Sequence, residues 1–143
     1  MDRGEPMSKI QVVYQSRGGN TKKVAEAIAE VLGVEPIHVD KAEKEDADIL
    51  FIGSAVYAAS LDKQMKDYLA KLEGAKIGKA VLFGTSAGGK KPFGMLKKRL
   101  LKLGIPVDER TCYIPGEFLF MNKGRPNEND LAKASEFAKG FLN

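Results

Sequence analysis

The segment Ser16-Arg17-Gly18-Gly19-Asn20-Thr21 has the composition of a turn that binds an anion. It follows an apolar run, Ile10 to Tyr14, and comes directly before a helical pattern. The first N–H groups of a helix have no partner within it, and the helix dipole adds partial positive charge there. The glycines let the backbone approach a bound group closely, so the unit predicts a phosphate site. The alternative is a plain turn capped by Asn20 or Thr21. The apolar positions of the helical pattern are Val24, Ala27, Ile28, Val31 and Leu32.

This turn lacks the common nucleotide-binding motifs. Neither GxxxxGK followed by Ser or Thr nor GxGxxG occurs in it, which argues against an NTPase P-loop and a dinucleotide site. It resembles instead the phosphate loop of the flavodoxin family, Ser/Thr-x-Ser/Thr-Gly-x-Thr. Ser16, Gly19 and Thr21 match that pattern, and Gly18 stands where the family has a hydroxyl residue. One phosphate hydrogen bond is therefore expected to be missing.

The rest of the chain alternates apolar runs with amphipathic helical patterns. Runs at residues 47–54, 79–85 and 110–114, and a short one at 35–39 after Gly33, predict strands. Such near-continuous apolar strands indicate a parallel sheet covered on both faces, and right-handed crossovers make it doubly wound. The resemblance covers residues 8–143 and implies a three-layer α/β fold whose five parallel strands have the order 2-1-3-4-5. Helical faces are expected at Leu61, Met65, Tyr68, Leu69 and Leu72, at Phe93, Leu96, Leu100 and Leu103, and at Leu131, Ala134, Ala138 and Phe141 after an Asn127–Asp130 cap.

Two further loops also resemble flavodoxin loops, and the three together imply that FMN is the cofactor. In such sheets ligands lie beyond the carboxyl ends of the strands, where loops 15–21, 54–60 and 85–92 are expected to meet. The resemblance implies that Tyr57 stacks on the flavin ring beside the backbone of Ala55 and Val56; the alternative is an ordinary surface tyrosine. It also implies that the other loop faces the pyrimidine edge of the ring, unless that loop is only a flexible surface segment. The residues of that loop are Thr85, Ser86, Ala87, Gly88 and Gly89.

Length and composition set further expectations. A chain of 143 residues with 43% hydrophobic content predicts one domain, residues 8–143, preceded by a disordered or added extension at 1–7. No apolar run is long enough to span a bilayer, and we expect a cytoplasmic protein. The single cysteine, Cys112, is expected to be a buried apolar residue, and the single histidine, His38, an ordinary strand residue. We expect no metal site, because these two residues do not make a cluster of ligands.

The net charge of +4 departs from the flavodoxin family, whose members are typically acidic. Much of the positive charge lies at Lys90-Lys91 and in the cluster Lys97-Lys98-Arg99-Lys102. One interpretation of this cluster is a solubilising surface, and the other is a docking site for acidic protein redox partners. No nucleic-acid motif accompanies it, so we expect no nucleic-acid partner, and we expect a monomer or weak dimer.

The resemblance implies an electron-transfer protein that shuttles electrons between redox partners through FMN, with no catalytic residue of its own. An FMN-dependent NAD(P)H or quinone reductase on the same fold is the second interpretation, and turnover of NADPH with a quinone would distinguish the two. The third is a flavin-free flavodoxin-like interaction domain, which titration with FMN would reveal.

Overall fold

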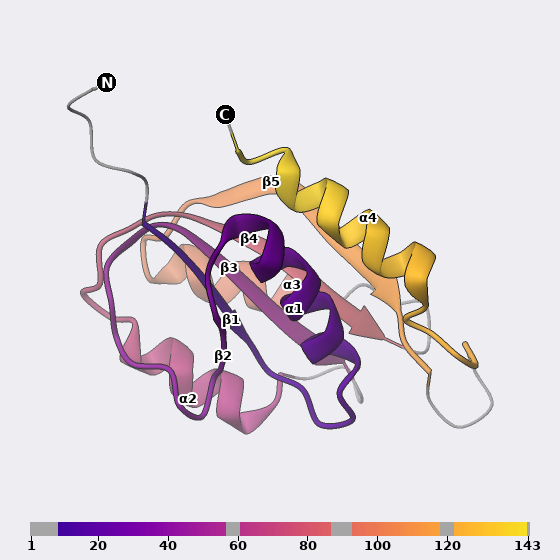
Figure 1. Cartoon of the computed structure of the whole chain (residues 1–143). Helices are drawn as coiled ribbons and strands as arrows, with labels where there is room; N and C mark the ends of the chain where they lie inside the picture. The colour runs from indigo at the N-terminus through magenta and orange to yellow at the C-terminus, as the bar shows by residue number, and fades with distance from the viewer. Residues whose placement is uncertain (1–8, 57–60, 87–92, 118–121, 143) are drawn as a thin grey trace, which may run out of the picture.

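The centre of the molecule is a parallel sheet of five strands in the order β2-β1-β3-β4-β5, as the sequence resemblance implied. This arrangement comes from a computed structural model, which describes residues 9–56, 61–86, 93–117 and 122–142. Helices α1 and α4 cover one face of the sheet, and α2 and α3 cover the other (Figure 1). The strands are β1 Ile10–Tyr14, β2 Pro36–His38, β3 Ala47–Val56, β4 Ile77–Ser86 and β5 Val107–Pro115. The helices are α1 Asn20–Leu32, α2 Lys63–Lys71, α3 Phe93–Lys102 and α4 Glu128–Lys139.

The observed strands differ from the expected runs mainly at their ends. β3 and β4 continue past the apolar runs, to Val56 and Ser86, and β5 begins three residues earlier than expected, at Val107. β5 pairs with β4 alone, so it is an edge strand that carries exposed polar residues before its buried half. An apolar run marks only the part of a strand that is buried on both faces, which is why the sequence predicted β5 too short.

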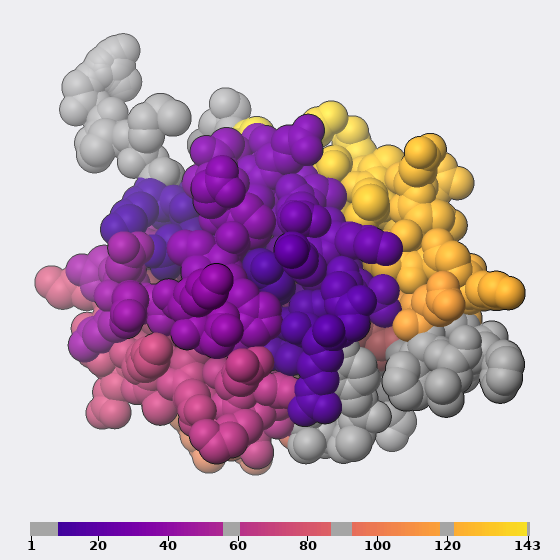
Figure 2. Space-filling model, turned by 60° about the horizontal axis from the view of Figure 1, so that its bottom comes forward, coloured from indigo at the N-terminus to yellow at the C-terminus, as the bar shows by residue number. Residues whose placement is uncertain are grey.

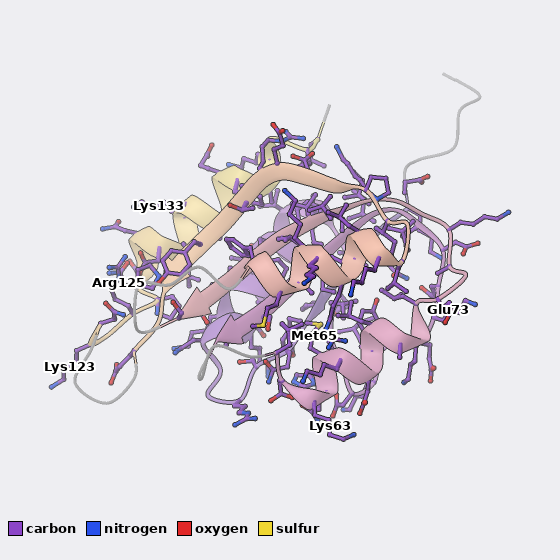
Figure 3. All side chains as sticks on the ribbon, turned by 180° about the vertical axis from the view of Figure 1, so that it is seen from behind. Lys63, Met65, Glu73, Lys123, Arg125 and Lys133 are labelled. Atoms are coloured by element: carbon purple, nitrogen blue, oxygen red, sulfur yellow. The ribbon has the colours of Figure 1, made fainter. Side chains whose placement is uncertain are left out.

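Two apolar layers, one on each face of the sheet, form the core. Successive side chains of a strand point to opposite faces, so Val12 and Phe51 pack with α1 while Val13 and Ile52 pack with α2 and α3. The expected helical faces pack into these layers, where most of their residues are buried and Leu103, Leu131 and Phe141 are partly buried. Figure 3 shows Met65 of α2 turned toward the sheet and Lys63 turned away. Cys112 is buried beside Ile114, as expected, and burial raises the pKa of its thiol to about 11.

Helix ends follow the signals in the sequence. α1 ends at Gly33, whose φ of 73° is the left-handed conformation that glycine adopts easily. α4 begins with the expected cap, in which Asn127 and Asp130 each accept a hydrogen bond from the backbone N–H of the other. Among the described residues, no helix combines the length and the apolar character needed to cross a membrane.

Candidate functional site

All five strands run in one direction, so their carboxyl ends lie along one edge of the sheet. The loop between β1 and α1 starts at this edge beside the end of β3, where the Gln15 N–H donates to the Gly53 carbonyl over 2.9 Å. The connector between β5 and α4, residues 116–126, also begins at this edge, where the Gly116 N–H donates to the Ser86 carbonyl at the end of β4 over 3.1 Å. In Figure 2, α1 borders α4 on one face of the molecule. The first predicted loop and the connector therefore belong to one region.

The geometry of the amino end of α1 suits an anion better than a side-chain cap. Gly19 is the N-cap residue, with φ 93° and ψ −5°, and no side chain of the described residues caps the first turn. The first turn also contains no acidic residue, whereas Asp62 caps α2 and two acids lie in the first turn of α4. A Cβ at Gly18 or Gly19 would meet no atom of the described residues within 4 Å, so these residues leave the space beside both glycines open. Unpartnered N–H groups and the helix dipole thus face a space that an anion can enter.

Hydroxyl groups surround this helix end. Ser16 Oγ accepts from the Gly19 N–H over 3.0 Å and still has its own proton to donate. Thr21 Oγ1 lies 2.8 Å from Thr85 Oγ1 at the end of β4, and both side chains are buried. One hydroxyl proton makes the bond between the two threonines, and the second remains for another acceptor.

The other two residues of the predicted loop hold neighbouring segments. The Asn20 amide donates to the Glu117 carbonyl over 3.0 Å, which ties α1 to the connector. The Arg17 guanidinium donates to Asp62 Oδ2 from Nη2 over 2.6 Å and from Nε over 2.9 Å. Burial of Asp62 opposes ionisation, but hydrogen bonds from the Gln64 N–H and from Arg17 lower its pKa below the usual range. The loop is therefore fastened to the start of α2 on one side and to the connector on the other.

The second and third predicted loops begin side by side at this edge. Ala55 is paired with Thr85 and Val56 with Ser86 in the β3–β4 register. Ser86 Oγ lies 2.7 Å from the Tyr113 hydroxyl, which joins the end of β4 to β5. The remaining predicted residues, Tyr57, Ala87, Gly88 and Gly89, lie outside the described residues, as do Lys90 and Lys91, so the expectations for them stay predictions.

Two residues at the site were not expected from the sequence. His38, interpreted as an ordinary strand residue, lies with Nε2 3.3 Å from the Ser16 backbone nitrogen and Nδ1 2.7 Å from Asp40 Oδ1. Gln15 is fully buried, and neither its amide nitrogen nor its amide oxygen has a hydrogen-bond partner in the part of the chain that the structure describes. The strand order offered a signal for His38, because the end of β2 must lie beside the end of β1 and hence beside the loop that follows β1.

Substitution of Gln15 by Met is expected to stabilise the ligand-free protein. A buried polar group without a partner costs about 1–3 kcal/mol, and methionine has a similar length without that penalty. We expect a gain of about 1–2 kcal/mol in the free energy of unfolding, measured with urea. The matched control is Gln11→Met, because the Gln11 amide bonds Glu45. A loss of stability in Gln15→Met alone would show that the amide has a partner, such as a bound water.

The cluster around Asp130 predicts a loss of stability in acid. The hydrogen bonds from the Arg125 guanidinium, which outweigh burial, and the bond from the Asn127 N–H lower the pKa of Asp130 below its usual range. A carboxylate with a lowered folded-state pKa contributes stability above its unfolded pKa of about 3.9 and loses it as pH falls through the folded value. Figure 3 shows Arg125 near the amino end of α4. We expect Asp130→Asn to reduce the stability difference between pH 6 and pH 3, measured by urea unfolding, whereas Asp67→Asn on α2 should leave it unchanged.

Comparison with known proteins identifies the family. A family model for the flavodoxin domain matches residues 11–112. The chain is 31% identical over a 153-residue alignment to an uncharacterized protein of Methanocaldococcus jannaschii, covering 94% of this chain and 98% of that protein. It is 41% identical over 96 residues to a flavodoxin of Aquifex aeolicus, covering 58% of this chain and 52% of that protein, so it spans about half of that relative. The chain belongs to the flavodoxin family.

Solved structures agree with this assignment at the level of the fold. A flavodoxin from the domain Archaea superposes with a TM-score of 0.72 at 20% identity, covering 91% of this chain and 93% of that one. The rubredoxin oxygen:oxidoreductase of Desulfovibrio gigas gives a TM-score of 0.73 at 16% identity, covering 94% of this chain and 35% of that one. The present fold thus corresponds to about a third of that larger chain.

Proposed function

We propose that this protein binds FMN and carries electrons between protein redox partners. The observation that supports the proposal most directly is the open amino end of α1, where Gly19 leaves the first-turn N–H groups facing free space beside Ser16 and the Thr21–Thr85 pair. Membership in the flavodoxin family points to the same cofactor. The expected cytoplasmic location stays a prediction.

The donor set at this site suits a phosphate ester. Phosphate presents several acceptor oxygens and negative charge, and the site offers backbone N–H groups, the Ser16 hydroxyl and no carboxylate in the first turn of α1. We assign the phosphate to residues 16–21, where Asn20 and Arg17 act by holding the loop to its neighbours. The ends of β3 and β4, residues 55–56 and 85–86, would then flank the ring. When bound, FMN supplies the redox chemistry, and the protein supplies binding and orientation.

The proposal is tested by titrating the ligand-free protein with FMN and, in parallel, with riboflavin, which lacks the phosphate. Flavin fluorescence and calorimetric heat report binding. We expect FMN to bind at least 100-fold more tightly than riboflavin, because two or more charge-assisted hydrogen bonds of about 1.5–3 kcal/mol each go to the phosphate. If saturating FMN gives neither a fluorescence change nor heat, the proposal is wrong, and the flavin-free interpretation is favoured.

A carrier and a reductase differ in what the purified, FMN-loaded protein does alone. We expect no steady turnover of NADPH with a quinone, but rapid exchange of electrons with a second redox protein. Sustained NADPH-dependent quinone reduction would support the reductase interpretation instead.

Acidic redox partners are the partner class that the charges favour. Five cations of α2 and α3 form no ion pair with any described residue. We call them the cationic face: Lys66 of α2 and Lys97, Lys98, Arg99 and Lys102 of α3. α3 contains no acidic residue. Between the two helices lies a groove with an apolar floor formed by Leu69, Ala70 and Leu103. Unpaired cations around an apolar groove fit an acidic protein surface, and such complementarity acts mainly on the rate of encounter.

Charge reversal tests this docking face. Arg99→Glu with Lys102→Glu is expected to slow electron exchange with a strongly acidic redox protein roughly tenfold at low ionic strength, and salt should reduce the difference. The matched control, Lys41→Glu with Lys133→Glu, makes the same change in net charge on other surfaces. Equal slowing in both double variants, measured by stopped-flow absorbance, would show that net charge alone sets the rate.

A further inference from the structure

His38 connects the end of β2 to the predicted phosphate loop through its two ring nitrogens. Nδ1 lies 2.7 Å from Asp40 Oδ1, and Nε2 lies 3.3 Å from the backbone nitrogen of Ser16 and 3.3 Å from its carbonyl oxygen. The edge of one ring faces the other in the contact with Tyr14, with centroids 5.2 Å apart and planes at 88°. The imidazole thus contacts Asp40, Ser16 and Tyr14. The protonation state of Nε2 is what can vary.

The protonation of Nδ1 follows from its partner. Nδ1 has two contacts with Asp40: the carboxylate oxygen Oδ1 at 2.7 Å, which can only accept, and the backbone N–H at 3.3 Å, which can only donate. We assign the proton to Nδ1, because the carboxylate contact is the shorter of the two and is charge-assisted. In the neutral ring Nε2 then has a lone pair and accepts the Ser16 N–H. In the charged ring Nε2 carries a proton and donates it to the Ser16 carbonyl. The same ring position therefore serves two different hydrogen bonds at the start of the loop.

These two states differ in what they offer an anion. The neutral ring occupies the Ser16 N–H and adds no charge. The charged ring releases that N–H and places a positive charge beside the loop, and a phosphate dianion favours both changes. We propose that His38, oriented by Asp40, is a positioning residue of the phosphate loop whose protonated form is the one that holds the phosphate. This inference rests on the proposed function, in which FMN is the ligand.

Charged groups of both signs lie near His38. Asp40 follows β2 and contacts Nδ1, and Asp62 caps α2. The Asp62 carboxyl interacts with His38, which contributes to its lowered pKa, and the Arg17 guanidinium of the loop binds the same carboxyl. Tyr14 of β1 contributes only its ring. A bound phosphate adds negative charge to this balance, so binding should drive proton uptake.

Protonation of His38 on ligand binding can be measured directly, because the chain contains one histidine. Its imidazole ¹⁵N and ¹³C NMR signals at pH 7.0 report the doubly protonated fraction without any need for assignment. We expect saturating FMN, and inorganic phosphate at high concentration, to increase the ratio of charged to neutral ring roughly fivefold to tenfold. Riboflavin, which has no phosphate, should leave the ratio unchanged.

Variants provide the second measurement. His38→Gln keeps a hydrogen-bonding group near Ser16 but cannot become charged, and we expect it to weaken FMN binding roughly tenfold at pH 6.5 and riboflavin binding not at all. Asp40→Asn removes the negative charge that faces Nδ1, and we expect it to weaken FMN binding by a smaller factor and riboflavin binding not at all. Circular dichroism confirms that each variant is folded, and the NMR measurement on the unaltered protein stands without them.

The outcomes separate the two proposals. If FMN does not bind at all, the proposed function fails. If FMN binds tightly but leaves the imidazole signals unchanged, or if riboflavin changes them equally, the proposed function stands and the role of His38 is overturned. Increased protonation with FMN and phosphate only, together with a phosphate-dependent loss in His38→Gln, supports the role.

Discussion

Replacing Gly19 with valine is expected to weaken FMN binding by roughly 100-fold, because the backbone at this position must keep φ positive to present the first-turn N–H groups. A β-branched residue is strained at φ 93°, and relief of that strain would rotate the amides of the loop away from the phosphate. We also expect the free energy of unfolding to fall by about 1–3 kcal/mol. Fluorescence titration measures the affinity, and urea unfolding measures the stability.

Gly33 provides a matched control on the same helix. It has φ 73°, and as at Gly19 a Cβ there would meet none of the described atoms within 4 Å. Gly33→Val should therefore carry similar strain and lose similar stability, but it lies at the opposite end of α1, and FMN affinity should remain within about twofold of the parent protein. Equal affinity in both variants would show that the amino end of α1 does not hold the phosphate.

Gly53→Ala is expected to destabilise the protein by about 3 kcal/mol or more, the largest single effect on stability that we predict. A Cβ at Gly53 would lie 2.1 Å from Cε2 and 2.3 Å from Cζ of Phe83, which is paired with it across β3 and β4. The Phe83 ring is fully buried and has no room to move away. Urea unfolding of the single variant measures this loss.

The smaller side chain in Phe83→Leu tests the cause. If the clash is with the ring, the double variant Gly53→Ala with Phe83→Leu should lose less stability than the two single variants lose in total. We expect this difference in the free energy of unfolding to be about 1–3 kcal/mol. This comparison also serves if Gly53→Ala alone fails to fold. Additive losses would place the strain elsewhere. Because the Gly53 carbonyl accepts the N–H of Gln15 at the start of the predicted phosphate loop, the same variants report how far the sheet supports the candidate site.

Local features of the candidate site were predictable because they depend on neighbours in the chain. The turn at residues 16–21, the end of α1 at Gly33 and the Asn127–Asp130 cap of α4 each follow from a few consecutive side chains. The burial of both sheet faces left apolar runs that revealed the strands, except where β5 is an exposed edge. The strand order came from the resemblance to a family, since periodicity carries no information about which strands are neighbours.

The contacts of the loop with the rest of the molecule were not predictable in the same way. His38, Glu117 and Asp62 reach the turn from three other elements, and each is separated from its partner by more than twenty residues. Nothing in the local sequence around His38 distinguishes it from an ordinary strand residue. The unpartnered amide of Gln15 is likewise a property of its surroundings and not of its type.

By itself, the sequence determined that a glycine turn joins the first strand to the first helix with an open helix end, because backbone conformation and helix capping are local properties. The tertiary structure alone decided which groups surround that turn. Parallel packing brings the end of β2, the start of α2 and the connector to one edge of the sheet, and only there do His38, Asp62 and Glu117 meet the loop. Such contacts depend on packing between segments that are distant in the chain, which no short stretch of residues encodes.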